Sequence, residues 1–94
     1  MGEIETIRDV EVINTLGLHA RPSALLVQLT NQFKSDLFVK RTDDPEEVNA
    51  KSIMGVMMLA AGQGTILRFR AIGEDGPALL DEIEKLFQSK FNED

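Results

Sequence analysis

Alternating apolar and polar side chains mark the segments of this chain that are typical of half-buried β-strands. In the clearest of them, Leu67 and Phe69 alternate with Arg68 and Arg70, so that one face is apolar and the other is charged. A turn signal at residues 43–45 (DDP) separates two shorter β-rich runs in the middle of the chain. The pattern predicts four strands, at residues 6–13, 36–41, 46–49 and 65–72.

A different spacing, in which apolar side chains recur every three or four residues, indicates three helices. Residues 20–33 form the first, with Pro22 in the first turn, where its missing N–H costs nothing. Ser52 immediately precedes the second, a short apolar run, and is a good N-cap. The third has a predicted buried stripe of six apolar residues: Leu79, Leu80, Ile83, Leu86, Phe87 and Phe91.

The order of these elements, β-α-β-β-α-β-α, predicts one α+β domain over residues 1–94. We expect an open-faced sandwich, in which three helices cover one face of a four-stranded antiparallel sheet. A chain of 94 residues can bury a modest core but is short for a typical cofactor-binding fold. The sequence shows no internal repeat and no linker.

Composition excludes several classes of function. The net charge of −6 argues against a nucleic-acid-binding protein, which usually has a basic face. The absence of cysteine excludes disulfides, thiolate zinc sites and thiol redox chemistry. No apolar run reaches the roughly 20 residues of a membrane span, and the acidic N-terminus does not resemble a secretory signal. We therefore expect no membrane insertion and a cytoplasmic location.

The only histidine, His19, lies directly before the first predicted helix. A helix start has backbone N–H groups without intrahelical partners and the positive end of the helix dipole, and both favour an anion. An imidazole there can act as a nucleophile toward phosphorus, and the guanidinium of Arg21 can grip a phosphate through two hydrogen bonds. Since the dipole disfavours a cation in the first turn, the position of Arg21 favours a functional role.

Three short motifs resemble the HPr family, the histidine phosphocarriers of the bacterial phosphoenolpyruvate-dependent phosphotransferase system. Residues 17–22 (GLHARP) resemble its active-site signature. Residues 49–54 (NAKSIM) resemble its regulatory-serine segment, and residues 62–65 (GQGT) resemble the turn into its last strand. The motifs occur at family-like spacing, and the resemblance extends over nearly the whole chain.

The resemblance implies a stoichiometric carrier and not an enzyme. His19 would accept a phosphoryl group on Nδ1 from Enzyme I and pass it to an EIIA-type acceptor, with Arg21 stabilising the charge in transit. The N–H groups of Ala20 and Arg21 would contact the phosphoryl oxygens. Gly17 would permit a sharp turn into the helix, although an ordinary loop glycine is an equal alternative. We expect no cofactor, no metal and a monomer.

Ser52 has two possible roles, of which the N-cap is the simpler. In the second it is a regulatory phosphorylation site for a dedicated enzyme such as an HPr kinase/phosphorylase. Phosphate there would add about 1.5–2 negative charges and would disturb the contacts of a partner without unfolding the domain.

The short helix after Ser52 has more apolar residues than one face can bury. Methionine adapts to several partners in turn, so Ile53, Met54 and Met57 are the predicted docking residues. Lys51 and Arg21 would form the charged rim of this surface. We expect the remaining apolar residues of the helix, Val56 and Leu59, to lie in the core.

The branch of the family stays open on sequence alone. Leu16 and the run at residues 57–61 (MMLAA) resemble nitrogen-type carriers. Lys51 before Ser52 instead resembles sugar-type carriers that are controlled by a serine kinase.

Three other functions compete with the carrier. An HPr-like regulatory binding module controlled at Ser52 would not need a histidine, so the intact His19 and Arg21 argue against it. An independent enzyme with His19 as general base would need a substrate pocket, for which the chain has little room. A nucleic-acid module is disfavoured by the acidic balance and by the absence of Tyr and Trp for base stacking.

Overall fold

The computed structural model of the protein describes residues 4–92. The strands are β1 (Glu5–Glu11), β2 (Asp36–Arg41), β3 (Val48–Asn49) and β4 (Ile66–Ile72). The helices are α1 (Ala20–Thr30), α2 (Ile53–Met58) and α3 (Gly76–Gln88), and a 3-10 turn, η1 (Lys90–Asn92), follows α3. This order confirms the predicted succession of elements.

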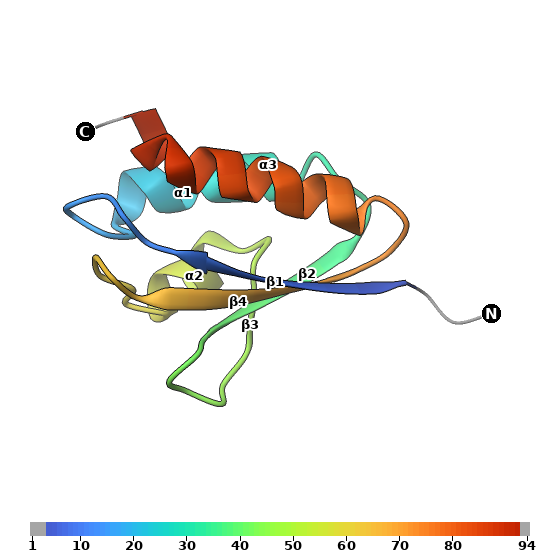
Figure 1. The fold of residues 1–94 in the computed structure, drawn as a ribbon, viewed down its shortest axis with the longest axis horizontal. Coiled ribbons are helices and arrows are strands. Elements are labelled where there is room, and N and C mark those ends of the chain that lie inside the picture. Colours follow the sequence, from blue (N-terminus) through green and yellow to red (C-terminus); the bar gives the residue numbers. More distant parts are fainter. Residues whose placement is uncertain (1–3, 93–94) are drawn as a thin grey trace.

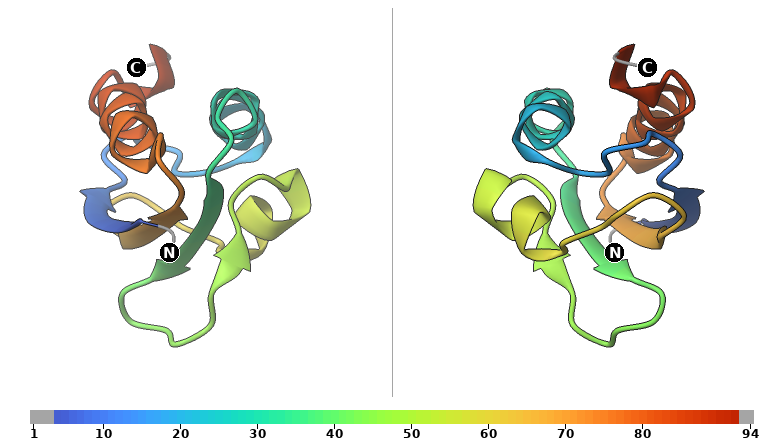
Figure 2. Two further views of the ribbon diagram at one scale, coloured as in Figure 1. Left: turned by 90° about the vertical axis from the view of Figure 1, so that its right-hand side faces the viewer. Right: turned by 90° about the vertical axis from the view of Figure 1, so that its left-hand side faces the viewer.

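The four strands form one antiparallel sheet in the order β1-β4-β2-β3. Helices α1 and α3 lie side by side over one face of the sheet, and α2 lies beside α1 on the β3 side (Figures 1 and 2). In the described residues, the opposite face has no helix over it. The structure is therefore the expected open-faced sandwich.

The core lies between the sheet and the helices. The alternation along β4 is realised as predicted, since Leu67, Phe69 and Ala71 are fully buried. Phe69 contacts Phe87 of α3 edge-to-face, with 5.9 Å between the ring centroids. Val56 and Leu59 are buried as predicted. Burying each such side chain contributes about 1.5–3 kcal/mol to stability.

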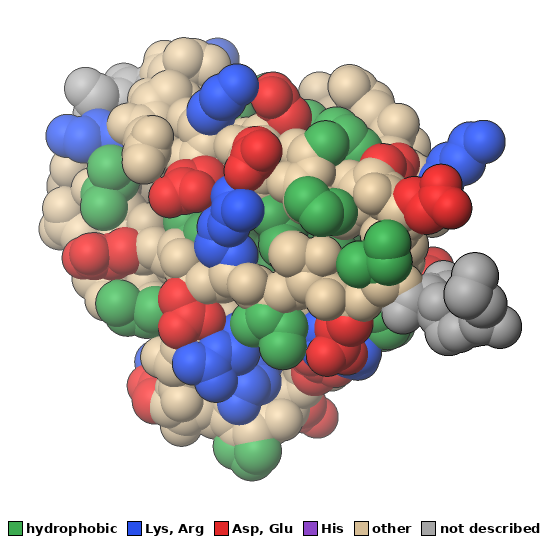
Figure 3. Space-filling view, turned by 45° about the vertical axis from the view of Figure 1, so that its right-hand side comes forward, with side chains coloured by type: hydrophobic (Ala, Val, Ile, Leu, Met, Phe, Trp, Pro, Cys, Tyr) green, Lys and Arg blue, Asp and Glu red, His purple; other side chains and the backbone are tan. Residues whose placement is uncertain are grey.

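The open face of the sheet is covered by ion pairs. Arg68 pairs with Asp9 through two hydrogen bonds of 2.8 and 3.0 Å, which lower the pKa of that carboxyl. Arg70 pairs with Glu5 and Glu47. Basic and acidic side chains are interspersed over the surface visible in Figure 3, with isolated hydrophobic groups between them. Exposed pairs of this kind contribute little stability, typically about 0–1 kcal/mol each.

Two helices end earlier than the sequence predicts. Helix α1 stops at Thr30 and not at Phe33, because Thr30 Oγ donates to Ala50 O (3.0 Å) and ties the helix end to the segment before α2. Helix α3 stops at Gln88, and Phe91 lies in η1 with a φ of 55°. The turn still buries Phe91 against Phe87, so its predicted place in the core is correct while its predicted helical conformation is wrong.

Three strands are also shorter than predicted, and of these β4 loses only Thr65. Strand β1 ends at Glu11, although Val12 remains buried and donates its N–H to Thr65 O. Strand β3 has only Val48 and Asn49, which pair with Val39 and Phe38. Residues 42–47 project from the sheet as a loop instead (Figure 2).

A carboxylate joins the loop before β2 to the start of α3. Asp75 accepts hydrogen bonds from the N–H groups of Lys34 (2.8 Å) and Ser35 (2.9 Å) and from the Ser35 hydroxyl. The hydroxyl bond, followed by the backbone bonds, lowers the pKa of Asp75. This contact fixes the end of the molecule opposite to His19.

Candidate functional site

His19 occupies the N-cap position of α1, with extended backbone angles (φ −79°, ψ −170°) and a half-buried side chain. Its carbonyl oxygen accepts the N–H of Ser23 (3.0 Å), which closes the first helical turn. Pro22 has no N–H, so the amides of Ala20 and Arg21 are the first-turn donors that have no acceptor within the helix. Imidazole and amide donors therefore meet at the positive end of α1.

The loop before His19 is fixed by close contacts with the chain that follows α2. Gly17 has a φ of +69°, and a Cβ built on it would lie 2.6 Å from Ala61 O. Leu18 donates its N–H to the same oxygen (2.9 Å), and Asn14 Nδ2 donates to Gly17 O (2.8 Å). Of the two alternatives for Gly17, the structure supports a glycine that the sharp turn into the helix requires, and not an ordinary loop glycine.

Arg21 is exposed on the first turn of α1. Among the described residues, it is the arginine that makes no ion pair, since Arg8, Arg41, Arg68 and Arg70 each contact a carboxylate. Its guanidinium is therefore not held by a carboxylate of the described chain and can meet an incoming anion.

Ser52 is the N-cap of α2, as predicted. Its Oγ accepts the N–H of Gly55 (3.2 Å), and its carbonyl oxygen accepts the N–H of Val56 (3.0 Å). The hydroxyl is half-buried. The capping role is thus observed directly.

Lys51 makes a contact that its predicted place in a charged rim did not include. Its ammonium donates to Phe33 O (2.7 Å), just beyond the end of α1, and Asn31 Nδ2 donates to Lys51 O (3.1 Å). Lysine near the end of a helix suits the negative end of the dipole. The charge of Lys51 therefore serves first to join α1 to the segment before α2.

Helices α1 and α2 run antiparallel. The start of α1 meets the end of α2 through Leu18 and Ala61, and the end of α1 meets the segment before α2 through Thr30 and Ala50. His19 and Ser52 consequently lie toward opposite ends of this helix pair. The 11 residues of α1 separate the two ends by about 16 Å at 1.5 Å per residue.

The outer side of α2 is strongly apolar. Ile53, Met54 and Met57, the predicted docking residues, are 43%, 72% and 43% exposed. Met58 and Leu16, which are not among the predicted docking residues, are 70% and 74% exposed. The available signal was the length of the helix: six residues bury only Val56, so adjacent methionines at 57 and 58 must both face solvent.

Two features are absent from residues 4–92. No cluster of three or more His, Asp or Glu side chains is arranged to hold a metal ion. No helix in this part of the chain has the length and apolar character needed to cross a membrane.

Comparisons with known proteins show which family this chain resembles. Residues 7–89 match the family model described as "PTS HPr component phosphorylation site". The phosphocarrier protein HPr of Xylella fastidiosa is 49% identical over 86 residues, which cover 92% of this chain and 94% of that protein.

Solved structures show the same fold. The crystal structure of HPr-C-His from Thermoanaerobacter tengcongensis superposes with a TM-score of 0.88 at 40% identity, over 95% of this chain and 98% of that one. The crystal structure of Bacillus subtilis Crh, a catabolite repression protein described as a domain-swapped dimer, matches with a TM-score of 0.71 at 46% identity, over 86% of this chain and 91% of that one.

Proposed function

The chain belongs to the HPr family of phosphocarrier proteins, and we propose that His19 is the residue that takes up the phosphoryl group. The donor is Enzyme I and the acceptor is an EIIA-type protein. The single observation that supports this most strongly is the position of His19 as the N-cap of α1, beside the two amides that have no intrahelical acceptor. In this proposal, those amides, on Ala20 and Arg21, donate to the phosphoryl oxygens.

The transfer is an in-line displacement at phosphorus. A ring nitrogen of neutral His19 attacks, the new N–P bond forms as the bond to the donor breaks, and the ring proton remains on the other nitrogen. By family resemblance the attacking atom is Nδ1. The reverse displacement moves the group to the acceptor, so the chain is regenerated and acts as a carrier and not as an enzyme.

Arg21 stabilises the group in transit. An exposed guanidinium without a carboxylate partner in the described chain can form two parallel hydrogen bonds to phosphoryl oxygens. The dipole penalty for a cation in the first turn disappears once the dianionic group is in place.

Both partners dock on the apolar side of α2. Ile53, Met54 and Met57 supply exposed surface that adapts to different partners, and Arg21 supplies charge near His19. The short, partly exposed patch fits weak and brief binding, which a relay requires. We further propose that the chain works in the cytoplasm as a monomer.

Ser52 is the proposed regulatory site, for an HPr kinase/phosphorylase. A phosphate on its Oγ would sit at the start of α2 and beside Ile53, so its charge would act on the docking surface. Because Ser52 lies toward the end of the helix pair opposite to His19, phosphorylation would reduce partner binding and leave the chemistry at the imidazole unaltered.

The test uses Enzyme I and phosphoenolpyruvate, with intact mass as the readout. The wild-type chain should gain one phosphate that is acid-labile and alkali-stable, and His19→Ala should gain none. His19→Gln serves as a second variant, and circular dichroism establishes that both are folded. If the wild-type chain gains no phosphate from an Enzyme I of its own organism, the carrier proposal fails and a regulatory module becomes the leading function.

A further inference from the structure

We propose that Asp44 and Glu46, on the loop between β2 and β3, form an acidic rim beside the methionines of α2. This rim selects partners that present lysine or arginine next to an apolar side chain. The inference rests on the proposed function, because the partners concerned are those of the phosphoryl relay.

The loop has four carboxylates, and the outer two are neutralised. Asp43 is held by Arg41 through two hydrogen bonds of 2.9 and 3.0 Å. Glu47 is held by Arg70 through bonds of 2.8 and 3.0 Å. These guanidinium contacts lower the pKa of both carboxyls. Their charges are therefore compensated within the protein.

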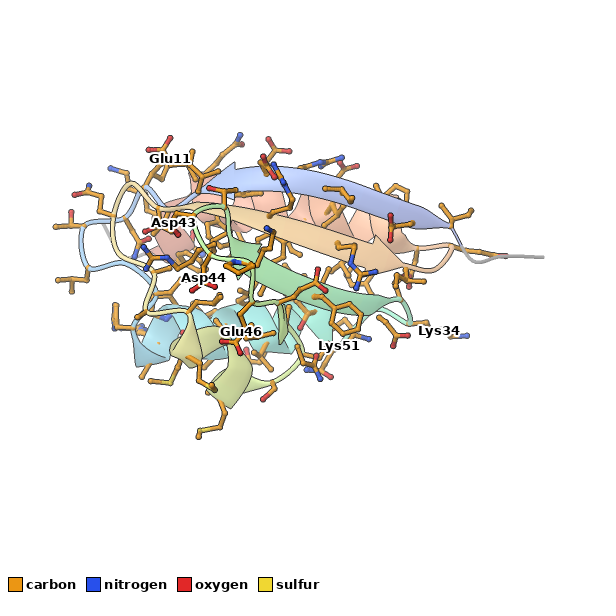
Figure 4. All side chains as sticks on the ribbon, turned by 90° about the horizontal axis from the view of Figure 1, so that it is seen from below. Glu11, Lys34, Asp43, Asp44, Glu46 and Lys51 are labelled. Atoms are coloured by element: carbon orange, nitrogen blue, oxygen red, sulfur yellow. The ribbon has the colours of Figure 1, made fainter. Side chains whose placement is uncertain are left out.

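The inner two carboxylates are not compensated in the same way. Within residues 4–92, neither Asp44 nor Glu46 has an ion pair, and both are exposed. The Glu46 N–H donates to Asp44 Oδ1 (2.9 Å), so the two residues are held in one tight turn. The guanidinium of Arg41 attracts Asp44 without forming an ion pair with it. The loop thus presents two exposed carboxylates at a fixed place, and both are labelled in Figure 4.

This place adjoins the docking surface. Asp44 and Glu46 line one hollow of about 30 Å³ together with Arg41, Val48, Met58 and Leu59. The hollow is too small for a ligand but shows that the loop is contiguous with the C-terminal end of α2, next to the docking residue Met57. Arg41 at the base of the loop donates to the carbonyl oxygens of Leu59 and Ala60 (3.4 and 3.3 Å). The rim is thereby attached to the end of α2.

The charge pattern of the surface defines the complementary partner. Arg21 provides positive charge near His19, and the ammonium of Lys51, which donates to the neutral carbonyl of Phe33 and keeps its charge, provides it before the start of α2. Along the edge of the methionine surface that faces the β2–β3 loop, Asp44 and Glu46 make the charge negative. A partner with a basic group beside its apolar contact gains association rate, and a partner with a carboxylate there is repelled.

The first arm of the test needs no phosphorylation. Two helical peptides present the same leucine face, flanked by lysines in one and by glutamates in the other, and each is titrated into the ¹⁵N-labelled chain. The lysine peptide should shift the amide signals of residues 44, 46 and 54–58, and the glutamate peptide should not. Asp44→Lys/Glu46→Lys should reverse this preference. Equal binding of both peptides, or no shift at these residues, would overturn the inference.

The second arm measures phosphoryl transfer with Enzyme I and each EIIA-type protein of the same organism. Asp44→Lys/Glu46→Lys should raise KM about tenfold for at least one partner at low salt, with kcat unchanged. Glu11→Lys/Asp36→Lys, which alters net charge equally on the open face of the sheet, should change KM less than about twofold. Equal effects of the two double variants would contradict the inference. If the wild-type chain accepts no phosphate, the proposed function fails while the peptide arm still decides the inference.

Discussion

Gly17 and Ala61 are in contact across the two segments that bracket the site. The Ala61 carbonyl oxygen accepts the N–H of Leu18 and would lie 2.6 Å from any Cβ at Gly17. At a φ of +69°, only glycine avoids both the backbone strain and the overlap. The backbone that leads into His19, two residues later, is therefore positioned by a contact with the segment that follows α2.

Replacing Gly17 with alanine should destabilise the protein by about 2–4 kcal/mol, from left-handed strain and from steric overlap with Ala61. Urea unfolding measures the change. The control is Gly62→Ala, whose Cβ would meet nothing within 4 Å and whose effect should stay within about 1 kcal/mol. Equal stability of the two variants would contradict the role given to Gly17.

Arg21→Gln should slow phosphoryl transfer about 10²-fold, because one charged donor to the phosphoryl group is lost. Its unfolding free energy should change by less than about 0.5 kcal/mol, since the side chain is exposed and makes no ion pair in the described chain. Single-turnover transfer from phosphorylated Enzyme I gives the rate. Arg68→Gln, on the open face of the sheet, is the matched control and should transfer normally; similar rates for both variants would argue against Arg21.

Two substitutions separate the roles of Ser52. Ser52→Ala should cost about 1 kcal/mol of stability through loss of the cap on the Gly55 N–H, with little effect on transfer. Ser52→Asp keeps a capping oxygen and should stay near wild-type stability while raising the KM for Enzyme I. Thermal unfolding and transfer kinetics measure both. A Ser52→Asp variant with unchanged KM would remove the support for regulation at this site.

Acid should weaken the Asp75 contact. The folded pKa of Asp75 lies below its ordinary value, so its contribution is complete above that value, about 4, and is lost as the pH falls through the folded pKa. The stability difference between wild type and Asp75→Asn should therefore be largest at pH 7 and should shrink below about pH 4. Urea unfolding at pH 7, 5 and 3 tests this, with Glu74→Gln as control. A difference that does not vary with pH would contradict the assignment.

The sequence predicted the local structure well because the signals were local. The alternation along β4 and the cap at Ser52 depend on neighbouring residues only, and both are observed. Element ends were less accurate because distant groups decide them. Thr30 ends α1 by bonding to Ala50, which lies 20 residues away, and no pattern within the helix contains that information.

The site was predicted in part for the same reason. The position of His19 at a helix start follows from the residues around it, and it is observed, while its chemical role stays a prediction. The sequence did not indicate that Lys51 would bind Phe33 O. The sequence also did not indicate that Asp43 would form an ion pair and Asp44 would not. That difference depends on where the guanidinium of Arg41 lies once the sheet has formed.

Helix α2 is attached to the core almost entirely through Val56 and the following Leu59, while Met54, Met57 and Met58 project into solvent. The residues that we propose for partner docking are thus not the residues that hold the fold together. A duplicated gene can exchange those methionines for other side chains and acquire new partners without first becoming unstable. On the proposed docking role, recognition in this protein can change with little constraint from folding.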